Sequence, residues 1–235
     1  MKDLRTYIKK NINEGFKLGK NKVKKEEDNF VDLDLPSGTL WGKYNIGATC
    51  GSTAESWYGD YFMWGDTEPA TNKKCDWYNY KYCLHDSNFL TKYCHIDKKD
   101  YWAGKNKIDN KLVLDEEDDM VNVNMGGDCK MPTKEQCEEL INNTTNKWVT
   151  NYNDIQGLNG LVLTSNMNDN TIFFPATGYR VSNSICNDNS DIYIWSSTIN
   201  IKNPANAYII RGWNNVIKIN YDFRSNGFVV RYVTN

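Results

Sequence analysis

The residues of this chain that could carry chemistry are concentrated between Cys75 and Asp119. The densest group is the run DEEDD at residues 115–119. Ca²⁺ binds six to eight oxygen ligands, so Asp115, Asp118 and Asp119 are candidates for a calcium site. The run lacks the alternating ligands and the glycine of an EF-hand loop, and carboxylates there would also stabilise the first turn of a helix. We therefore expect a structural or solvated role, with calcium as the alternative and no other cofactor.

Cysteine and histidine form a second group of possible metal ligands, made up of Cys75, Cys83, His85, Cys94 and His95. Zinc sites usually contain cysteine pairs separated by two to four residues. The pairs here are Cys-x-His and Cys-His, so we do not expect zinc. The chain has seven cysteines, an odd number, and its first residues show no apolar stretch of signal-peptide type. Buried free thiols are the expected state.

The sequence offers little for catalysis. Its two histidines lie in one loop region, and it has no G-x-S-x-G nucleophile motif. Asp60, Asp66 and Glu68, in the stretch YGDYFMWGDTEP, could form the carboxylate pair of a glycosidase. A stretch so rich in glycine and aromatic residues instead favours turns and hydrogen bonds to the backbone. We predict that the protein is not an enzyme.

Charge and hydropathy restrict the partners. The net charge is -2 and no long basic face occurs beyond the N-terminal segment, which argues against nucleic acid as a partner. No apolar run approaches the roughly 18 residues that a membrane-spanning helix needs, so we expect no membrane insertion.

Residues 1–28 differ in pattern from the rest of the chain and are predicted to form an N-terminal anchoring helix with a basic linker. Leu4, Ile8 and Ile12 recur every four residues, which is typical of an amphipathic helix. The helix is expected to stop near Gly15, and Phe16, just beyond it, is the fourth predicted anchoring residue. So short a helix is not stable alone in water. It therefore needs a partner surface, and a frayed tail is the alternative.

From Phe30 onward the pattern is that of an α+β domain, predicted to span residues 29–235. Alternation at 31–35 and a Pro-Ser-Gly turn before Leu40 predict a hairpin, and residues 51–110 predict long loops packed by aromatic side chains. The clearest helix follows Thr133, an N-cap candidate with Gln136 at the capping-box spacing. Trp64, Trp148 and Trp195 are predicted core residues. Short strands are predicted at 148–152, 160–165, 171–174, 192–196, 207–211, 216–221 and 228–233.

The last strands and turns carry the residue types of adaptable binding surfaces, namely rigid aromatic rings beside short hydrogen-bonding groups. The loop between Asn200 and Asn206 is of special interest because a strand is predicted on either side of it. Ordinary loops of an asparagine-rich chain are the alternative. The predicted ligand-binding residues, placed in turns or on the outward phase of strands, are Tyr193, Asn200, Asn203, Asn206, Trp213, Asn214, Asn215, Asn220, Tyr221, Asp222, Arg224 and Asn226.

Eight sequence blocks, in order and spacing, resemble one family, the Fibrobacter succinogenes major paralogous domain-like family. The resemblance covers residues 30–233. The blocks are VDLDLPSGTLWGKYNIGA (31–48), YGDYFMWGDTEP (58–69), YKYCLHDSNFLTKYC (80–94), IDNKLVLDEEDDMVNVNMGGDCKMPTKEQCEELI (108–141), IFFPATGYR (172–180), YIWSS (193–197), NAYII (206–210) and RSNGFVVRYV (224–233).

The resemblance implies a C-type-lectin-like fold, related to formylglycine-generating-enzyme-like domains and to the variable proteins of diversity-generating retroelements. It implies that Cys83 and Cys94 lie close together, as a disulfide or a buried thiol pair. Lys130 and Tyr232 depart from the usual Arg and Pro of the family. The catalytic cysteine pair of formylglycine-generating enzymes is missing, since the last cysteine is Cys186.

In relatives diversified by retroelements the C-terminal section faces the ligand, which implies the same location here. The family is common in gut Bacteroidetes and their phages, which leads to the expectation of a phage virion component such as a head fibre or capsid decoration. Its N-terminus would dock on a capsid or other virion protein, and its domain would bind a host-surface glycan or protein as a homo-oligomer. The alternatives are a purely structural virion assembly protein and a bacterial cell-surface adhesin.

Overall fold

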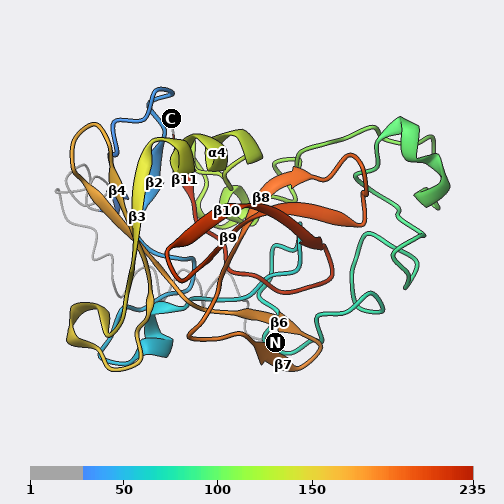
Figure 1. The fold of residues 1–235 in the computed structure, drawn as a ribbon. Helices are drawn as coiled ribbons and strands as arrows, with labels where there is room; N and C mark the ends of the chain where they lie inside the picture. The colour runs from blue at the N-terminus through green and yellow to red at the C-terminus, as the bar shows by residue number, and fades with distance from the viewer. Residues whose placement is uncertain (1–28, 235) are drawn as a thin grey trace, which may run out of the picture.

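A computed structural model describes residues 29–234 of the chain. The predicted anchoring residues Leu4, Ile8, Ile12 and Phe16 lie outside the described residues. The described part is a mixture of small β-sheets and a few short helices (Figure 1). The helical elements are α3 (Met120–Met125), α4 (Lys134–Asn142) and the 3-10 helices η1 (Ala54–Trp57), η2 (Ile96–Tyr101) and η3 (Tyr152–Asp154).

The strands pair antiparallel in four small sheets, ordered β1-β2-β11, β3-β4-β5, β6-β7 and β10-β9-β8. The last of these holds the longest strands. The bounds are β1 Phe30–Val31, β2 Leu40–Gly42, β3 Thr144–Val149, β4 Gly160–Ser165, β5 Thr171–Pro175, β6 Tyr179–Val181, β7 Ser184–Cys186, β8 Ile192–Ile199, β9 Asn206–Trp213, β10 Val216–Phe223 and β11 Val233–Thr234.

Helix α4 begins where local sequence predicts it. The Thr133 side chain accepts the backbone N–H of Gln136, and the Gln136 side chain accepts the backbone N–H of Thr133. These two hydrogen bonds satisfy two N–H groups that the first turn leaves without a helical partner. The helix buries Cys137 and Leu140 and contacts β3, β8, β9 and β10. The capping box therefore fixes where α4 enters the core.

Replacing Thr133 by alanine is expected to lower the free energy of unfolding by about 1 kcal/mol, because the N–H of Gln136 loses its acceptor. Urea denaturation measures this change. Thr145→Ala, at an exposed position of β3, is the control and should stay within about 0.5 kcal/mol of the parent protein. Equal effects of both substitutions would show that the cap does not stabilise the helix.

The predicted hairpin is present in a shortened form. Strand β1 pairs with β2 at Phe30 and Val31, and the turn near Gly38 uses a left-handed backbone with φ of 74°. Leu33 and Leu35 lie between the two strands, outside any strand, with their side chains in the core. Burial of these two leucines, rather than ladder hydrogen bonding, accounts for the apolar alternation in the sequence.

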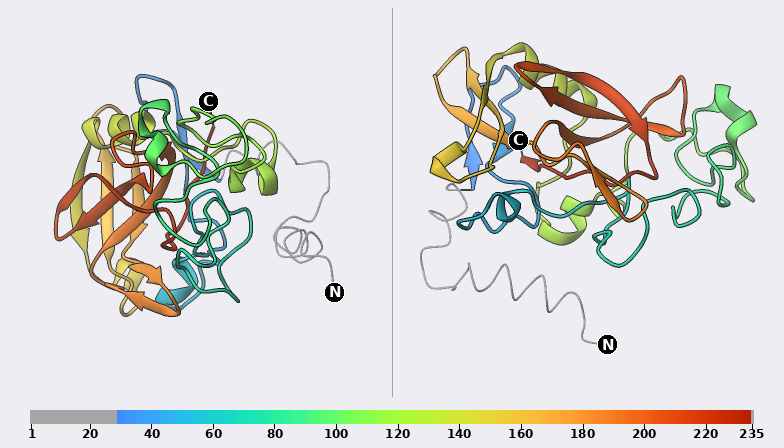
Figure 2. Two further views of the ribbon diagram at one scale, coloured as in Figure 1. Left: turned by 90° about the vertical axis from the view of Figure 1, so that its right-hand side faces the viewer. Right: turned by 60° about the horizontal axis from the view of Figure 1, so that its bottom comes forward.

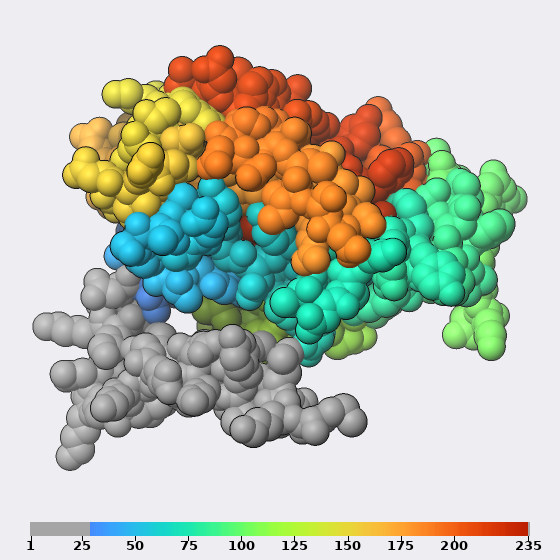
Figure 3. All heavy atoms as spheres, turned by 90° about the horizontal axis from the view of Figure 1, so that it is seen from below, coloured from blue at the N-terminus to red at the C-terminus, as the bar shows by residue number. Residues whose placement is uncertain are grey.

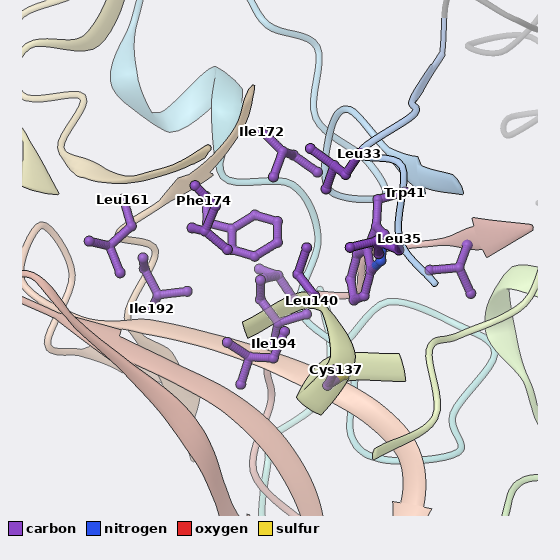
Figure 4. Close-up of a cluster of buried hydrophobic side chains, with 14 of the residues drawn as sticks. Leu33, Leu35, Trp41, Cys137, Leu140, Leu161, Ile172, Phe174, Ile192 and Ile194 are labelled. Carbon is purple, nitrogen blue, oxygen red and sulfur yellow. The ribbon is translucent and has the colours of Figure 1, made fainter. Parts of the chain in front are cut away.

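The first hydrophobic cluster lies between the three-stranded sheets and α4. Figure 4 shows Leu33, Trp41, Phe174 and Leu140 pointing toward a common centre, with Ile194 contributed by β8. All five side chains are fully or almost fully buried. This cluster covers one face of the β8–β9–β10 sheet, since Ile210 and the half-buried Ile217 and Ile219 also join it.

A second cluster covers the opposite face of the same sheet. Trp195 and Trp64, both fully buried, belong to it, together with Ile209 of β9 and Phe228. The indole N–H of Trp195 donates to the Phe62 carbonyl, and that of Trp64 donates to the Ser196 carbonyl, both at 2.8 Å. The predicted core positions of these two tryptophans are confirmed, and Trp148 is half-buried at the edge of the first cluster.

The predicted strand at 228–233 is wrong except at its end, where β11 begins at Val233. Residues 228–232 pass between the two clusters, so that Phe228 and Val230 contribute to the second and Val229 to the first. Their backbone partners are spread over Phe62, Ile194 and Ile46 instead of one neighbouring strand. Successive side chains of this segment are buried alternately in the two clusters, which gives the two-residue period of a β-strand. The segment nevertheless has no continuous row of hydrogen bonds to one neighbouring strand.

Loops dominate the part of the chain between residues 50 and 115, as predicted. Residues 80–115 form one end of the molecule, beyond the sheets, in the teal and green of Figures 2 and 3. Residues 54–58 instead pack beside β5, in a cluster with Leu158 and Phe173. The side chains of Met63, Tyr80 and Leu90 belong to a third hydrophobic cluster, which forms the core of this loop region. Tyr232 packs edge-on against Phe30 and over Gly42, where a Cβ would come within 2.4 Å of its ring.

Candidate functional site

The acidic run folds into a cluster that already contains cations from the protein itself. Side-chain oxygens of Asp115, Glu117 and Asp118 come within 4.8 Å of one another. The Lys92 ammonium lies 2.9, 3.3 and 2.5 Å from these three carboxylates. Lys111 lies 2.5 Å from Asp115. Among the described residues, the positive charge that such a cluster requires is therefore supplied by lysines.

Asp118 is the centre of this network. Its carboxylate also accepts the Tyr93 hydroxyl at 2.5 Å and lies 3.3 Å from the Lys81 ammonium. Burial acts to raise the pKa of Asp118, but hydrogen bonds from Lys92, Tyr82 and Tyr93 outweigh it and hold the pKa at about 2. The group is thus a charged structural cross-link between the loops near residues 80–93 and the start of α3.

Asp119, the third calcium candidate, points elsewhere. It is the N-cap of α3 and accepts the backbone N–H groups of Val121, Asn122 and Met131 at 2.8–3.2 Å. Both of its oxygens are engaged by these donors, so the grouping of Asp119 with the other two candidates is wrong. The expected helix-start role is confirmed for Asp119, because an anionic cap satisfies amides that a first turn leaves unpaired.

The cysteines do not gather into a metal site or a disulfide among residues 29–234. All seven are free thiols. Cys83 donates to the carbonyls of Trp77 and Tyr80, whereas Cys94 donates to the Lys98 carbonyl. The disulfide alternative is therefore wrong for Cys83 and Cys94, and both thiols are buried. Burial raises the pKa of Cys75 and of Cys94 to about 11, so both stay protonated at neutral pH.

Five of the predicted ligand-binding residues are buried, which corrects their assignment to an outward surface. They are Tyr193, Asn200, Asn206, Arg224 and Asn226, all less than 9% exposed. The prediction assumed that one face of the last sheet is open to solvent, whereas the first cluster covers one face and the second cluster covers β8 and part of β9 on the other. These side chains are consequently held inside the protein.

The Asn200–Asn206 loop is organised by its own hydrogen bonds. The amide of Asn200 donates to the Asn206 carbonyl, and the Asn200 side chain accepts the amide of Lys202. The half-buried Asn203 accepts the amide of Ala205 through its side chain. Asparagine recurs here because its side chain closes turns, and the loop presents Ile201 and Lys202, rather than its asparagines, to solvent.

Arg224 is the structural centre of the same region. Its fully buried guanidinium donates to the Tyr80 hydroxyl and to the carbonyls of Lys92, Tyr93 and Pro204 at 2.8–3.1 Å. It also lies 4.8 Å from the centre of the Trp64 ring. One side chain thereby joins the residue 80–93 loops to the end of the β9–β10 region.

Asn214 and Asn215 form the two-residue turn between β9 and β10. Both have left-handed backbone, with φ of 40° and 62°, the conformation that a tight hairpin turn requires and asparagine tolerates. The Asn215 side chain accepts the Trp148 amide at 2.5 Å. These two residues are exposed, and their residue type is explained by the turn.

A partly exposed polar-aromatic face of the sheet is built around Arg211. Registers place Arg211 directly opposite Tyr193 of β8 and Lys218 of β10, so all three share one face of the sheet. The Arg211 guanidinium lies 5.0 Å from the Trp213 ring centre and 5.3 Å from that of Tyr193, and the Lys218 ammonium lies 5.1 Å from the Trp213 ring. Such cation–π contacts hold long side chains in one arrangement.

Two carboxylates complete this arrangement. Asp191 pairs with Arg211 at 2.9 Å. Asp222 accepts the amide of Phe223 and the side chain of Asn226 through one oxygen, and burial raises its pKa. We name Asp191, Arg211, Trp213, Lys218 and Asp222 the sheet surface. It combines a half-buried indole with two cations and two carboxylates.

The structure separates the remaining predicted residues. Tyr221, half exposed, lies on the opposite face of β10, paired with Tyr208 on the side of α4. Asn220 shares the face of the sheet surface, but its oxygen is taken by the Tyr221 amide. Trp213 and Asp222 share one face of the sheet but lie six residues apart along β9, since Trp213 pairs with Val216 and Asp222 pairs with Ala207.

Sequence reasoning missed Arg211, Lys218 and Asp191. The signal for Arg211 and Lys218 was available in the alternation of β9 and β10, since Arg211, Trp213, Lys218 and Asp222 lie at alternate positions of these strands and are polar or aromatic. Asp191 precedes β8, and the alternation gave no signal for it. The pairing register that sets Arg211 beside Lys218 required the turn at Asn214 and Asn215 to be located first.

Among residues 29–234, none of the helices has the length and apolar character needed to cross a lipid bilayer. Comparison with protein-family models, with curated proteins and with solved structures gave no match to this chain.

Proposed function

We propose that this protein is a non-enzymatic binding protein that displays a lectin-like domain, and that the sheet surface contacts its ligand. The observation that carries the proposal is the Trp213 indole fixed beside Arg211 and Lys218 on a sheet with a core on both faces. Tryptophan and arginine dominate the energetics of binding surfaces, because they offer large contact area and several donors at fixed positions.

The ligand class follows from the same groups. The sheet surface offers two cations, two carboxylates and an indole edge. Such a surface suits a ligand with many hydrogen-bonding groups, such as a glycan or a polar protein surface on a host cell. The protonated buried thiols of Cys75 and Cys94 support a binding role over nucleophilic chemistry at these cysteines.

The biological context rests on the sequence blocks. Their resemblance to a family of gut Bacteroidetes and their phages supports a C-type-lectin-like fold and a virion location, as a head fibre or capsid decoration. Residues 1–28 would dock on a capsid protein, and many copies on one particle would raise weak binding to useful avidity.

The test uses the full chain displayed in many copies on fluorescent beads, applied to a glycan array and to host cells. Trp213→Ala is expected to weaken binding by roughly 30-fold or more, the effect of a hot-spot aromatic. Tyr221→Ala is the matched control, since it removes an exposed aromatic from the neighbouring strand on the opposite face. It should leave binding unchanged.

Two outcomes would contradict the proposal. Absence of binding by the multivalent protein to any glycan or cell would favour the purely structural assembly protein. Loss of binding in Tyr221→Ala but not in Trp213→Ala would move the site to the α4 side of the sheet.

A further inference from the structure

A cavity of about 460 Å³ lies in the loop-rich end of the molecule, among residues 84–111. Its lining includes the Trp102 indole, the half-exposed Leu84, and four lysines, Lys92, Lys105, Lys107 and Lys111. Within the described part of the chain, Asp109 is the one carboxylate that lines it. The volume falls in the range of about 300–1,000 Å³ that small-molecule sites occupy.

Two chain segments that line this cavity, around Thr91 and Ala103, are joined by backbone hydrogen bonds next to it. The fully buried Leu90 donates its amide to the Tyr101 carbonyl and accepts the Ala103 amide, both at 2.7 Å. Asp109 accepts the amides of Tyr93 and Cys94 at 2.6 and 3.0 Å. The carboxylate that lines the cavity is therefore committed to the backbone.

Trp102 is held in place as one wall. Its indole N–H donates to the Asn106 carbonyl at 2.9 Å. Gly104 lies so close that a Cβ there would come within 2.4 Å of the ring. Residues 102–106 thus fold tightly around the indole, which fixes its orientation before any ligand arrives.

The lysines divide into two pairs. Lys92 and Lys111 are neutralised by Asp115, Glu117 and Asp118, which do not line the cavity. Lys105 and Lys107 are exposed and form no ion pair with any carboxylate of residues 29–234. The cavity therefore carries two uncompensated positive charges beside an aromatic wall.

We propose that this cavity binds an anionic saccharide, meaning a sugar that bears sulfate, phosphate or carboxylate groups. Lys105 and Lys107 would pair with the anionic groups, and Trp102 would contact the sugar ring. The site shares no residue with the sheet surface, so the proposal stands apart from the function proposed above.

A saccharide fits these observations better than nucleic acid. A cavity of this volume accommodates one or two sugar rings, whereas nucleic-acid sites follow a phosphate backbone along an extended basic stripe. The net charge of -2 and the acidic cluster beside Lys92 give no such stripe among the described residues.

The experiment is isothermal titration calorimetry of the full chain with a heparin-derived disaccharide that carries sulfate groups. Its desulfated form and a short single-stranded oligonucleotide are the comparison probes. The sulfated disaccharide should bind more tightly than either, and more weakly at higher ionic strength. Lys105→Gln/Lys107→Gln is expected to weaken its binding about tenfold, as two ion pairs are lost.

Lys147→Gln/Lys202→Gln is the matched control, since it removes two lysines from other elements with the same change in net charge. It should leave the affinity unchanged. Equal weakening by both double variants, equal affinity for the desulfated sugar, tighter binding of the oligonucleotide, or no binding at millimolar concentrations would each overturn the proposal. Because Trp213 is intact in both variants, these results are independent of the sheet-surface test.

Discussion

Replacing Arg224 by alanine is expected to lower the free energy of unfolding by about 3–5 kcal/mol. The guanidinium is fully buried and donates to the Tyr80 hydroxyl and to the carbonyls of Lys92, Tyr93 and Pro204. Removing it leaves several acceptors without donors in a region from which water is excluded, and each such group costs about 1–3 kcal/mol. It also opens a cavity beside Trp64, because the guanidinium packs over that ring.

Urea unfolding followed by tryptophan fluorescence measures this effect. Arg224→Lys should recover only part of the lost stability. The acceptors lie around the plane of the guanidinium group, and a single ammonium cannot donate to all of them. Lys218→Ala is the control, since it removes a partly exposed cation from the neighbouring strand and should stay within about 0.5 kcal/mol of the parent. If Arg224→Ala were as mild as Lys218→Ala, Arg224 could not be the link between the loops and the sheet, and a surface role would regain support.

Replacing Asp118 by asparagine is expected to lower the free energy of unfolding by about 2–3 kcal/mol at neutral pH. The carboxylate is nearly buried and serves Lys92, Lys81 and Tyr93 together. The amide keeps the size of the side chain but loses the charge. Lys92 would then rely on Asp115 and on Glu117, whose side chain is 74% exposed.

Asp118 also makes the stability of the folded protein depend on pH in the acidic range. The pKa of Asp118 is about 2 in the folded protein, below the value of about 3.9 in an unfolded chain. The folded state therefore binds fewer protons between these two values, so stability is fully present above about pH 4 and is lost as the pH falls towards 2. In Asp118→Asn this part of the pH dependence should disappear, which urea titrations at several acidic pH values will measure.

Glu117→Gln is the matched control for Asp118→Asn, because it removes the same charge from the same cluster at an exposed position. Exposed ion pairs contribute about 1 kcal/mol or less, so its unfolding and acid profile should follow those of the parent. A similar loss in both variants would indicate that the total charge of the cluster matters, rather than the buried contacts of Asp118.

Local signals in the sequence determined a large part of the fold. The capping box at Thr133, the strand at 160–165 and the asparagine turn at 214 and 215 each depend on a few neighbouring residues, and each is where the pattern indicates. The helix-start role of Asp119 belongs to the same class, since a cap is decided by the amides that come after it in the chain. The caps and the turn are predictable because their hydrogen bonds are short in sequence. The strand at 160–165 pairs with β3 and β5 and is indicated instead by its apolar residues.

Burial of the polar residues was decided only by the tertiary structure. Arg224 is of a residue type common on binding surfaces, yet it is buried because the loops that carry Tyr80, Lys92 and Tyr93, more than 130 residues earlier in the chain, surround its guanidinium. Alternation along a strand reports which residues share a face, but not whether that face meets water or a second core.

The two proposed sites have the same origin. Arg211 and Lys218 become neighbours through strand pairing, and Lys105 and Lys107 gain a cavity wall from Leu84 and Trp102 across a loop. By itself, the amino-acid sequence determined the residue types and the local turns. The assembly of these residues into surfaces depended on contacts between segments far apart in the chain, which no local pattern encodes.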